Sequence, residues 1–160
     1  MSEVINEKQI QQKITRMAFE IYERNLHTKG VVFAGVTGMG LILSELLAKE
    51  LSHISELQVE QLEVQLDKSD VANSKISLSQ NLDLTGKSLI LVDDVINTGR
   101  TVAYAMKPFL QEEISKMELA VLVNRAHGLF PLRPDYTGFE LSTTLNEHIR
   151  VDLSSSSYSV

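Results

Sequence analysis

Three segments of the chain carry apolar residues at helical spacing. From 7 to 25 they recur every three or four positions, and Asn6 stands where a helix N-cap is expected. The same period recurs over 41–51 and over 101–113. Each segment is therefore predicted to be an amphipathic helix with one buried face.

Between the helices lie short apolar runs with many β-branched residues. They span 31–34, 88–92 and 119–123. Runs of this length and composition predict strands buried on both faces. Residues 57–66 alternate apolar and polar but slip in phase at Gln61 and Leu62, which predicts a bulged strand or two short strands. A last, shorter strand is expected at 149–153.

Strands that alternate with helices predict an α/β fold with a parallel sheet, in which ligands bind at the carboxyl ends of the strands. One domain is expected over 1–153, and 154–160, which begins with a run of serines, is expected to be a flexible tail. The polar stretch 67–82 is long for a connection within a domain and is interpreted as a functional lid.

Composition narrows the chemistry. The 160 residues include no cysteine, which excludes disulfides, a thiolate nucleophile and cysteine-bound metals, and the four histidines lack metal-ligand spacing. A net charge of −6 argues against broad attraction to nucleic acid. No run reaches the roughly 20 apolar residues of a membrane span, so a cytoplasmic protein without a membrane partner is expected.

One loop carries the clearest chemical signal. Two carboxylates and a Gly/Thr-rich segment follow the apolar strand 88–92 and lead into a helix: Asp93, Asp94, Val95, Ile96, Asn97, Thr98, Gly99, Arg100 and Thr101. Backbone N–H groups at a helix start, with threonine hydroxyls, suit a phosphate, and paired carboxylates suit ribose hydroxyls or waters around Mg²⁺. An isolated Asp-Asp pair would more often be only a helix cap, but the full string favours a sugar-phosphate site.

This string resembles the phosphoribosyl-pyrophosphate (PRPP) signature of type I phosphoribosyltransferases. The resemblance implies a mainly parallel sheet flanked by helices with a small hood, and transfer of ribose 5-phosphate from Mg²⁺-bound PRPP to a nitrogen nucleophile. It also implies that Asp93 and Asp94 are the catalytic carboxylates, without direct metal ligation, and that Asn97 to Thr101 bind the 5-phosphate. A homodimer or higher homo-oligomer is expected on the same ground.

Further sites follow only from that resemblance. The glycine loop with Thr37, Gly38, Met39 and Gly40 matches the family's pyrophosphate loop in position, but it has no lysine or arginine. Lys68 and Lys75 are then the only cations of the long loop that could cover the pyrophosphate. Asn124, Arg125 and Tyr136 are expected to bind the base, with Tyr136 as an aromatic platform beneath it.

Over most of its length the chain is similar to the branch of the family that combines uracil phosphoribosyltransferase activity with attenuation of the pyr operon. Asn124 and Thr143 replace a lysine and an aspartate of the purine enzymes, and this favours a pyrimidine, uracil, as acceptor. Two alternatives stay open: an RNA-binding regulator of pyrimidine genes, suggested by Thr15, Arg16, Arg24 and Arg133, or a catalytically weak sensor that binds a nucleotide or PRPP. RNA is disfavoured because the chain is acidic and Phe19 stands where a histidine is expected.

Overall fold

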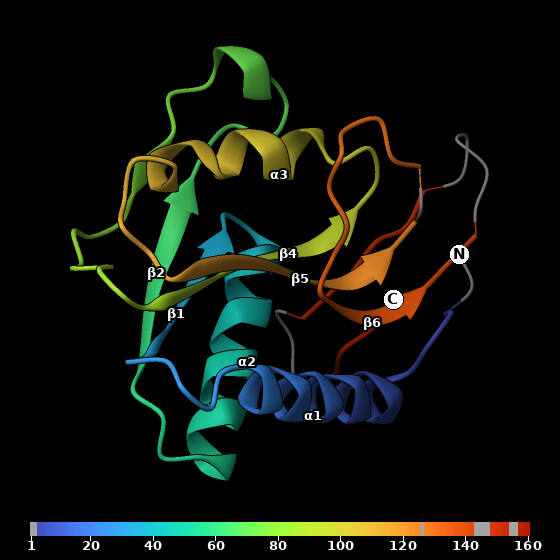
Figure 1. Cartoon of the computed structure of the whole chain (residues 1–160). Helices are drawn as coiled ribbons and strands as arrows, with labels where there is room; N and C mark the ends of the chain where they lie inside the picture. Colours follow the sequence, from blue (N-terminus) through green and yellow to red (C-terminus); the bar gives the residue numbers. More distant parts are fainter. Residues whose placement is uncertain (1–2, 126, 143–147, 154–156) are drawn as a thin grey trace.

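The computed structural model describes residues 3–125, 127–142, 148–153 and 157–160. Its centre is a six-stranded sheet in the order β3-β2-β1-β4-β5-β6 (Figure 1). The strands are β1 (Val31–Val36), β2 (Val59–Gln65), β3 (Ser77–Leu78), β4 (Ser88–Ile96), β5 (Lys116–Asn124) and β6 (Tyr136–Glu140). Only β3 runs antiparallel to its neighbour. The predicted α/β fold with a mainly parallel sheet is confirmed.

Helices cover both faces of this sheet. The helices are α1 (Glu7–Arg24), α2 (Met39–Ile54) and α3 (Arg100–Ala105), with short 3₁₀ turns at Val71–Asn73 and Lys107–Phe109. Figure 1 shows α1 and α2 on one face of the sheet and α3 on the other. Each face has its own apolar core, and β1 is buried along its whole length between them. This arrangement explains why the central strands are continuous apolar runs.

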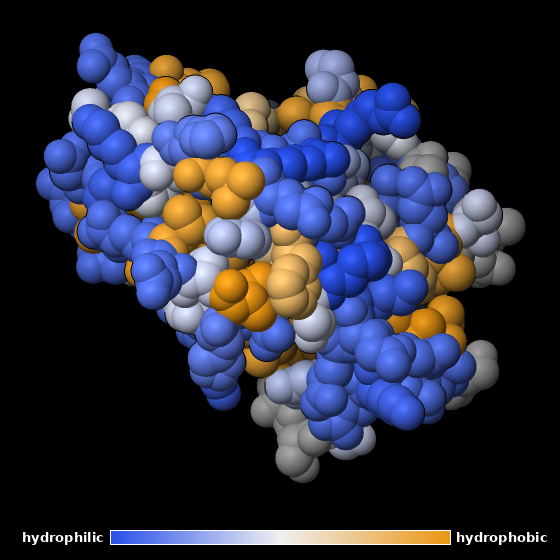
Figure 2. Space-filling model, turned by 60° about the horizontal axis from the view of Figure 1, so that its bottom comes forward, coloured by the Kyte–Doolittle hydropathy of each residue, from blue (hydrophilic) through white to orange (hydrophobic). Residues whose placement is uncertain are grey.

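The first helix begins where the sequence predicts. The Asn6 side chain accepts a hydrogen bond from Gln9 N, and the Gln9 side chain accepts one from Asn6 N, which makes a complete capping box. The face around this helix is mostly hydrophilic, with a central group of apolar side chains (Figure 2). Phe19 on α1 is 46% exposed, so one large apolar side chain of the helix stays outside the core.

Three elements differ from their predictions. β2 is one regular strand. Val59 packs with the core under α1 and α2, while Leu62 and Val64 pack with the core under α3. The phase slip therefore reflects two covered faces rather than a bulge. The helix predicted over 101–113 ends at Ala105, because Pro108 lacks the N–H that a continuing helix needs. β6 was not predicted as a strand.

The chain end also differs from the expected flexible tail. Residues 149–153 contribute only an isolated bridge, in which Asp152 and Ser159 exchange backbone hydrogen bonds of 2.9 Å. Val160 is 8% exposed, packs into the core, and accepts a hydrogen bond from Val4 N. The described part of 154–160 is thus held by backbone pairing and apolar burial.

The hood stays a prediction, as does the role of Thr143, which lies outside the described residues.

Candidate active site

Asp93 and Asp94 lie near the carboxyl end of β4, in the middle of the sheet. Asp93 is 2% exposed, and its Oδ1 accepts a hydrogen bond of 2.9 Å from Asp94 N. Asp94 is partly exposed. Because neighbouring residues of a strand point to opposite faces, the two carboxylates approach the strand end from different sides.

Lys68, from the loop after β2, supplies the positive charge beside them. Its Nζ lies 2.9 Å from Asp93 Oδ1 and 3.6 Å from Asp94 Oδ1. Burial lowers the pKa of Lys68, but the two carboxylates outweigh burial and leave that pKa raised. Burial, only partly offset by Lys68, raises the pKa of Asp93 to about 7. Asp93 is therefore a carboxylate held in an environment that disfavours its charge.

The segment after Asp94 encloses a small hollow of about 70 Å³. It is lined by Asp93 and by the run Val95 to Val102. Gly99, at φ +89°, occupies the left-handed region directly before α3, and an added Cβ there would lie 3.3 Å from Phe130 Cβ. The carbonyl of Thr98 accepts hydrogen bonds from the N–H groups of Leu129 and Phe130, which hold the loop over 128–132 against it.

A larger hollow of about 300 Å³ adjoins the first and shares Ile96, Asn97 and Thr98 with it. The rest of its wall comes from the ends of β5 and β6 and from the loop between them: Asn124, Gly128, Leu132, Arg133, Pro134 and Glu140. Two backbone bonds fix these strand ends side by side. Arg125 N donates to Ile96 O at 3.0 Å, and Leu141 N donates to Asn124 O at 2.9 Å.

The glycine loop after β1 approaches the same carboxylates. Gly38 has φ +90° and precedes α2, whose first turn contains no acidic residue. A Cβ added at Gly40 would lie 2.9 Å from Val92 O and 3.0 Å from Asp93 Oδ1. Thr37 is held by a hydrogen bond of 2.6 Å to Glu63. The start of α2 thus packs directly on Asp93, with outward N–H groups available to an anion.

The residues expected at the base do not all meet. Asn124 lines the larger hollow, whereas Arg125 is 6% exposed and is not part of its wall. Tyr136 is fully buried within the core under α1, and its hydroxyl donates to Glu118 Oε1 at 2.8 Å. Burial is the main cause that raises the pKa of this hydroxyl far above its usual range. The expectation that Tyr136 forms the base platform is therefore wrong in this structure, because its ring has no open face.

Comparison with known proteins agrees with this geometry. The family model for the phosphoribosyl transferase domain matches residues 1–156. The chain belongs to the phosphoribosyltransferase family. Proteins named bifunctional protein PyrR from Bacillus cereus (strain B4264) and Bacillus anthracis (strain CDC 684 / NRRL 3495) are 36% identical to it over 160 residues, covering 94% of this chain and 89% of theirs. The chain is thus a PyrR-like phosphoribosyltransferase, a glycosyltransferase-type enzyme.

Solved structures show the same fold. A hypoxanthine-guanine phosphoribosyltransferase from Bacillus anthracis aligns with a TM-score of 0.73 at 20% identity, covering 88% of this chain and 82% of that one. A hypoxanthine phosphoribosyltransferase from Trypanosoma cruzi aligns with a TM-score of 0.76 at 14% identity, covering 87% and 80%. At these identities the likeness concerns the architecture.

Three features of this phosphoribosyltransferase were missed or only partly read in the sequence. Glu140 was not proposed for the site, and Arg133 was named only for the RNA-binding alternative. Lys68 and Lys75 were grouped together, yet Lys75 lines a separate hollow with Lys107 and Gln111. A search for strand ends that meet at one edge of the sheet would have found Glu140, had β6 been recognised.

The described residues suit a metal that arrives with its substrate. They contain no cluster of three or more acidic or histidine side chains able to hold a metal by themselves. Asp93 and Asp94 still offer two carboxylates beside the glycine loop, and Mg²⁺ is usually bound by one or two carboxylates together with substrate phosphates and water. The pair therefore fits Mg²⁺ that is bound together with substrate phosphates.

In the described part of the chain, no helix is long and apolar enough to cross a membrane.

Proposed function

We propose that this enzyme transfers ribose 5-phosphate from PRPP to uracil and releases pyrophosphate. The observation that carries the proposal is the position of Asp93 between three places where parts of PRPP and a base would bind. Asp93 lines the small hollow and packs against the start of α2 at Gly40. The small hollow in turn shares Ile96, Asn97 and Thr98 with the larger hollow. These are the sites proposed for the 5-phosphate, the pyrophosphate and the base.

In this proposal the ribose lies over Asp93 and Asp94. The bond from C1 to the pyrophosphate oxygen breaks while the bond from C1 to the base nitrogen forms, so positive charge develops on the ribose ring. Two carboxylates that are positioned in advance stabilise that charge, and their ordinary role is to accept hydrogen bonds from the ribose hydroxyls. Catalysis then consists mainly of positioning and electrostatics.

The 5-phosphate is proposed to bind in the 70 Å³ hollow, where Thr98, Gly99 and Thr101 contribute to the wall. The pyrophosphate is proposed to bind the outward N–H groups at Thr37 to Gly40, because that loop has no cationic side chain. Lys68 must leave the carboxylates when the ribose binds, and its ammonium can then pair with the pyrophosphate. Mg²⁺ bound to PRPP would neutralise the leaving group, with Asp93 and Asp94 holding its water ligands.

Uracil is proposed as the acceptor because asparagine, with its side-chain amide, stands at both position 124 and position 97. An amide cannot act as a general base, so the proton that leaves the base nitrogen is proposed to pass to the departing pyrophosphate or to water instead of to Asn97. Asn124 can both donate and accept hydrogen bonds at the wall of the base hollow.

Two of the four residues that suggest the RNA-binding alternative, Arg16 and Arg24, make contacts within the protein. Arg16 donates to Glu20 and to the carbonyls of Thr137 and Gly138. The guanidinium of Arg24 lies 5.1 Å from the centre of the Tyr136 ring. These contacts give both arginines a structural role in joining α1 to β6.

A homo-oligomer and a cytoplasmic location stay predictions.

The test is a product assay with Mg²⁺, PRPP and uracil, hypoxanthine, guanine or adenine, run on wild type and on the double variant Asp93→Asn/Asp94→Asn. Turnover with uracil that the double variant abolishes is the expected result. Absence of product, together with tight nucleotide binding measured by calorimetry, would favour the sensor alternative instead. A purine as the preferred acceptor would contradict the pyrimidine proposal.

A further inference from the structure

Glu140, an exposed residue at the carboxyl end of β6, contributes to the wall of the larger hollow. It is the register partner of Asn124 on β5, and Asn124 is the register partner of Ile96 on β4. The hydrogen bond from Leu141 N to Asn124 O holds the two strand ends together directly beside Glu140. Ile96, Asn124 and Glu140 therefore form one short row across the edge of the sheet, and Asn97 directly follows Ile96.

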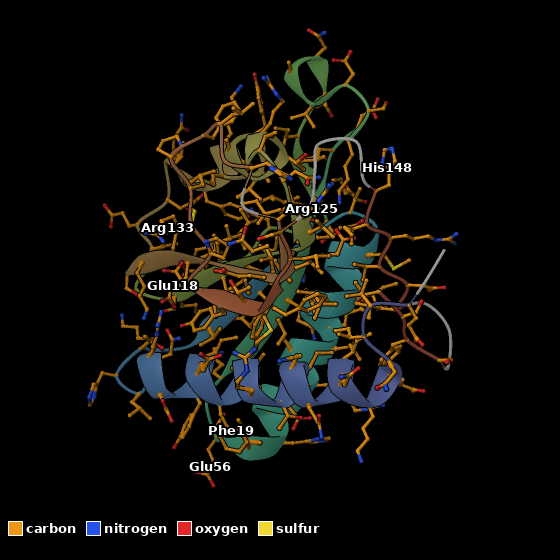
Figure 3. All side chains as sticks on the ribbon, turned by 90° about the vertical axis from the view of Figure 1, so that its right-hand side faces the viewer. Phe19, Glu56, Glu118, Arg125, Arg133 and His148 are labelled. Carbon is orange, nitrogen blue, oxygen red and sulfur yellow. The ribbon has the colours of Figure 1, made fainter. Side chains whose placement is uncertain are left out.

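The polar groups of this hollow have distinct hydrogen-bonding abilities. The Glu140 carboxylate only accepts, Arg133 only donates, and the amides of Asn97 and Asn124 can do either. A ligand edge that matches this wall presents an N–H to the carboxylate and carbonyl oxygens to the neighbouring donors. Arg133 projects from the loop between β5 and β6 (Figure 3).

Nucleobases fall into two classes by this criterion. Uracil and hypoxanthine each carry a ring N–H next to a carbonyl, whereas cytosine and adenine carry a bare ring nitrogen next to an amino group. A carboxylate facing the second class would meet a lone pair instead of a hydrogen. Such a mismatch leaves polar groups unpaired, which is how hydrogen-bonding sites reject near-isosteric ligands.

We propose that Glu140 is a specificity-determining residue that selects keto bases over amino bases by accepting the ring N–H. The inference rests on the proposed function only in assigning this hollow to the base. It does not depend on the choice between pyrimidine and purine, because the pyrimidines and the purines each include a keto base and an amino base.

The test is calorimetric binding of uridine, inosine, cytidine and adenosine 5′-monophosphates. Wild type is compared with Glu140→Gln and Glu140→Ala, and with Glu56→Gln, an exposed position at the far end of the molecule (Figure 3). Wild type and Glu56→Gln are expected to bind the keto nucleotide of each pair about tenfold more tightly. Glu140→Gln should lose that preference because its amide can also donate, and Glu140→Ala should lose keto affinity without gaining amino affinity.

The outcomes separate the two proposals. An unchanged keto preference in both Glu140 variants would overturn the role of Glu140 and leave uracil as the acceptor. Tighter binding of inosine than uridine monophosphate, with the keto preference lost in Glu140→Gln, would overturn uracil and support Glu140. Wild type that binds none of the four, or binds keto and amino nucleotides equally, would overturn the inference. Circular dichroism spectra that match wild type establish that each variant is folded.

Discussion

The ammonium of Lys68 lies 2.9 Å from the Oδ1 atom of Asp93, a carboxylate with 2% of its surface exposed. Lys68 comes from a loop, whereas Asp93 is fixed in a central strand, so the lysine is the partner that can move. The free enzyme thus holds a cation where the ribose is proposed to bind. Lys68 both stabilises the empty site and is available to the pyrophosphate when the site fills.

We predict that Lys68→Met lowers both stability and activity. Loss of the cation leaves Asp93 without its partner, and the half-exposed lysine limits the cost to about 1 kcal/mol, or ~3 °C in melting temperature for a domain of this size. The kcat/KM for PRPP should fall about tenfold if Lys68 pairs with the pyrophosphate. Thermal denaturation and steady-state kinetics measure the two effects.

Lys75→Met is the matched control, because Lys75 belongs to the same loop but lines a different hollow. It should leave both quantities near wild type. Equal kinetic losses in the two variants would show that loop charge in general, and not the Lys68 contact, supports PRPP binding.

Asp93 also makes stability depend on pH. Its pKa rises from 3.8 in the unfolded chain to about 7 in the folded protein, so the folded state holds an extra proton between these values. Stability must therefore fall as pH rises from about 4 to about 7, and the loss is complete above 7. Asp93→Asn stays neutral and should escape this loss.

The measurement is the melting temperature of wild type and Asp93→Asn at pH 5, 6, 7 and 8. The melting temperature of Asp93→Asn should exceed that of wild type by a margin that grows with pH and reaches several degrees by pH 8. A change of about 1 kcal/mol in stability corresponds to ~3 °C. Glu56→Gln, far from the site, should follow wild type at every pH. Parallel curves for Asp93→Asn and wild type would contradict the raised pKa.

Much of the fold was readable because central parallel strands are covered on both faces and leave continuous apolar runs, as in 88–92. β6 was missed because it is a short edge strand interrupted by Gly138. A Cβ at Gly138 would lie 2.5 Å from Leu122 O, so this glycine is required by the close approach of β5. A glycine within a strand pattern is a usable signal for such an approach.

The segment proposed to bind the 5-phosphate could be singled out from the sequence because it is continuous in the chain. The hollow proposed for the base could not, because its wall combines residues of three separate strand ends and a loop. Tyr136 illustrates the difference: its residue type suits a base platform, but it begins β6, while Glu140 ends that strand at the site. Only the register of β5 and β6 distinguishes the two positions.

Gly40→Ala is predicted to damage the site and the fold together. Its Cβ would lie 2.9 Å from Val92 O and 3.1 Å from Asp93 Cα, both backbone atoms of a central strand, so α2 must shift. We expect a loss of about 1–3 kcal/mol in unfolding free energy and loss of PRPP binding. Urea denaturation and PRPP calorimetry measure them. Gly128→Ala, whose Cβ would meet only Phe130 O at 3.9 Å, should keep wild-type stability.

Tyr136→Phe separates a core residue from a base-binding one. The change removes the hydroxyl that donates to Glu118 and leaves the ring in place, so the unfolding free energy should fall by about 1 kcal/mol. Because the ring is fully buried, the KM for uracil should stay within twofold of wild type, a difference of about 0.4 kcal/mol. Denaturant unfolding and uracil saturation kinetics give the two values. A large rise in KM with unchanged stability would return Tyr136 to the base site, since only a side chain that contacts the base alters its binding without altering the core.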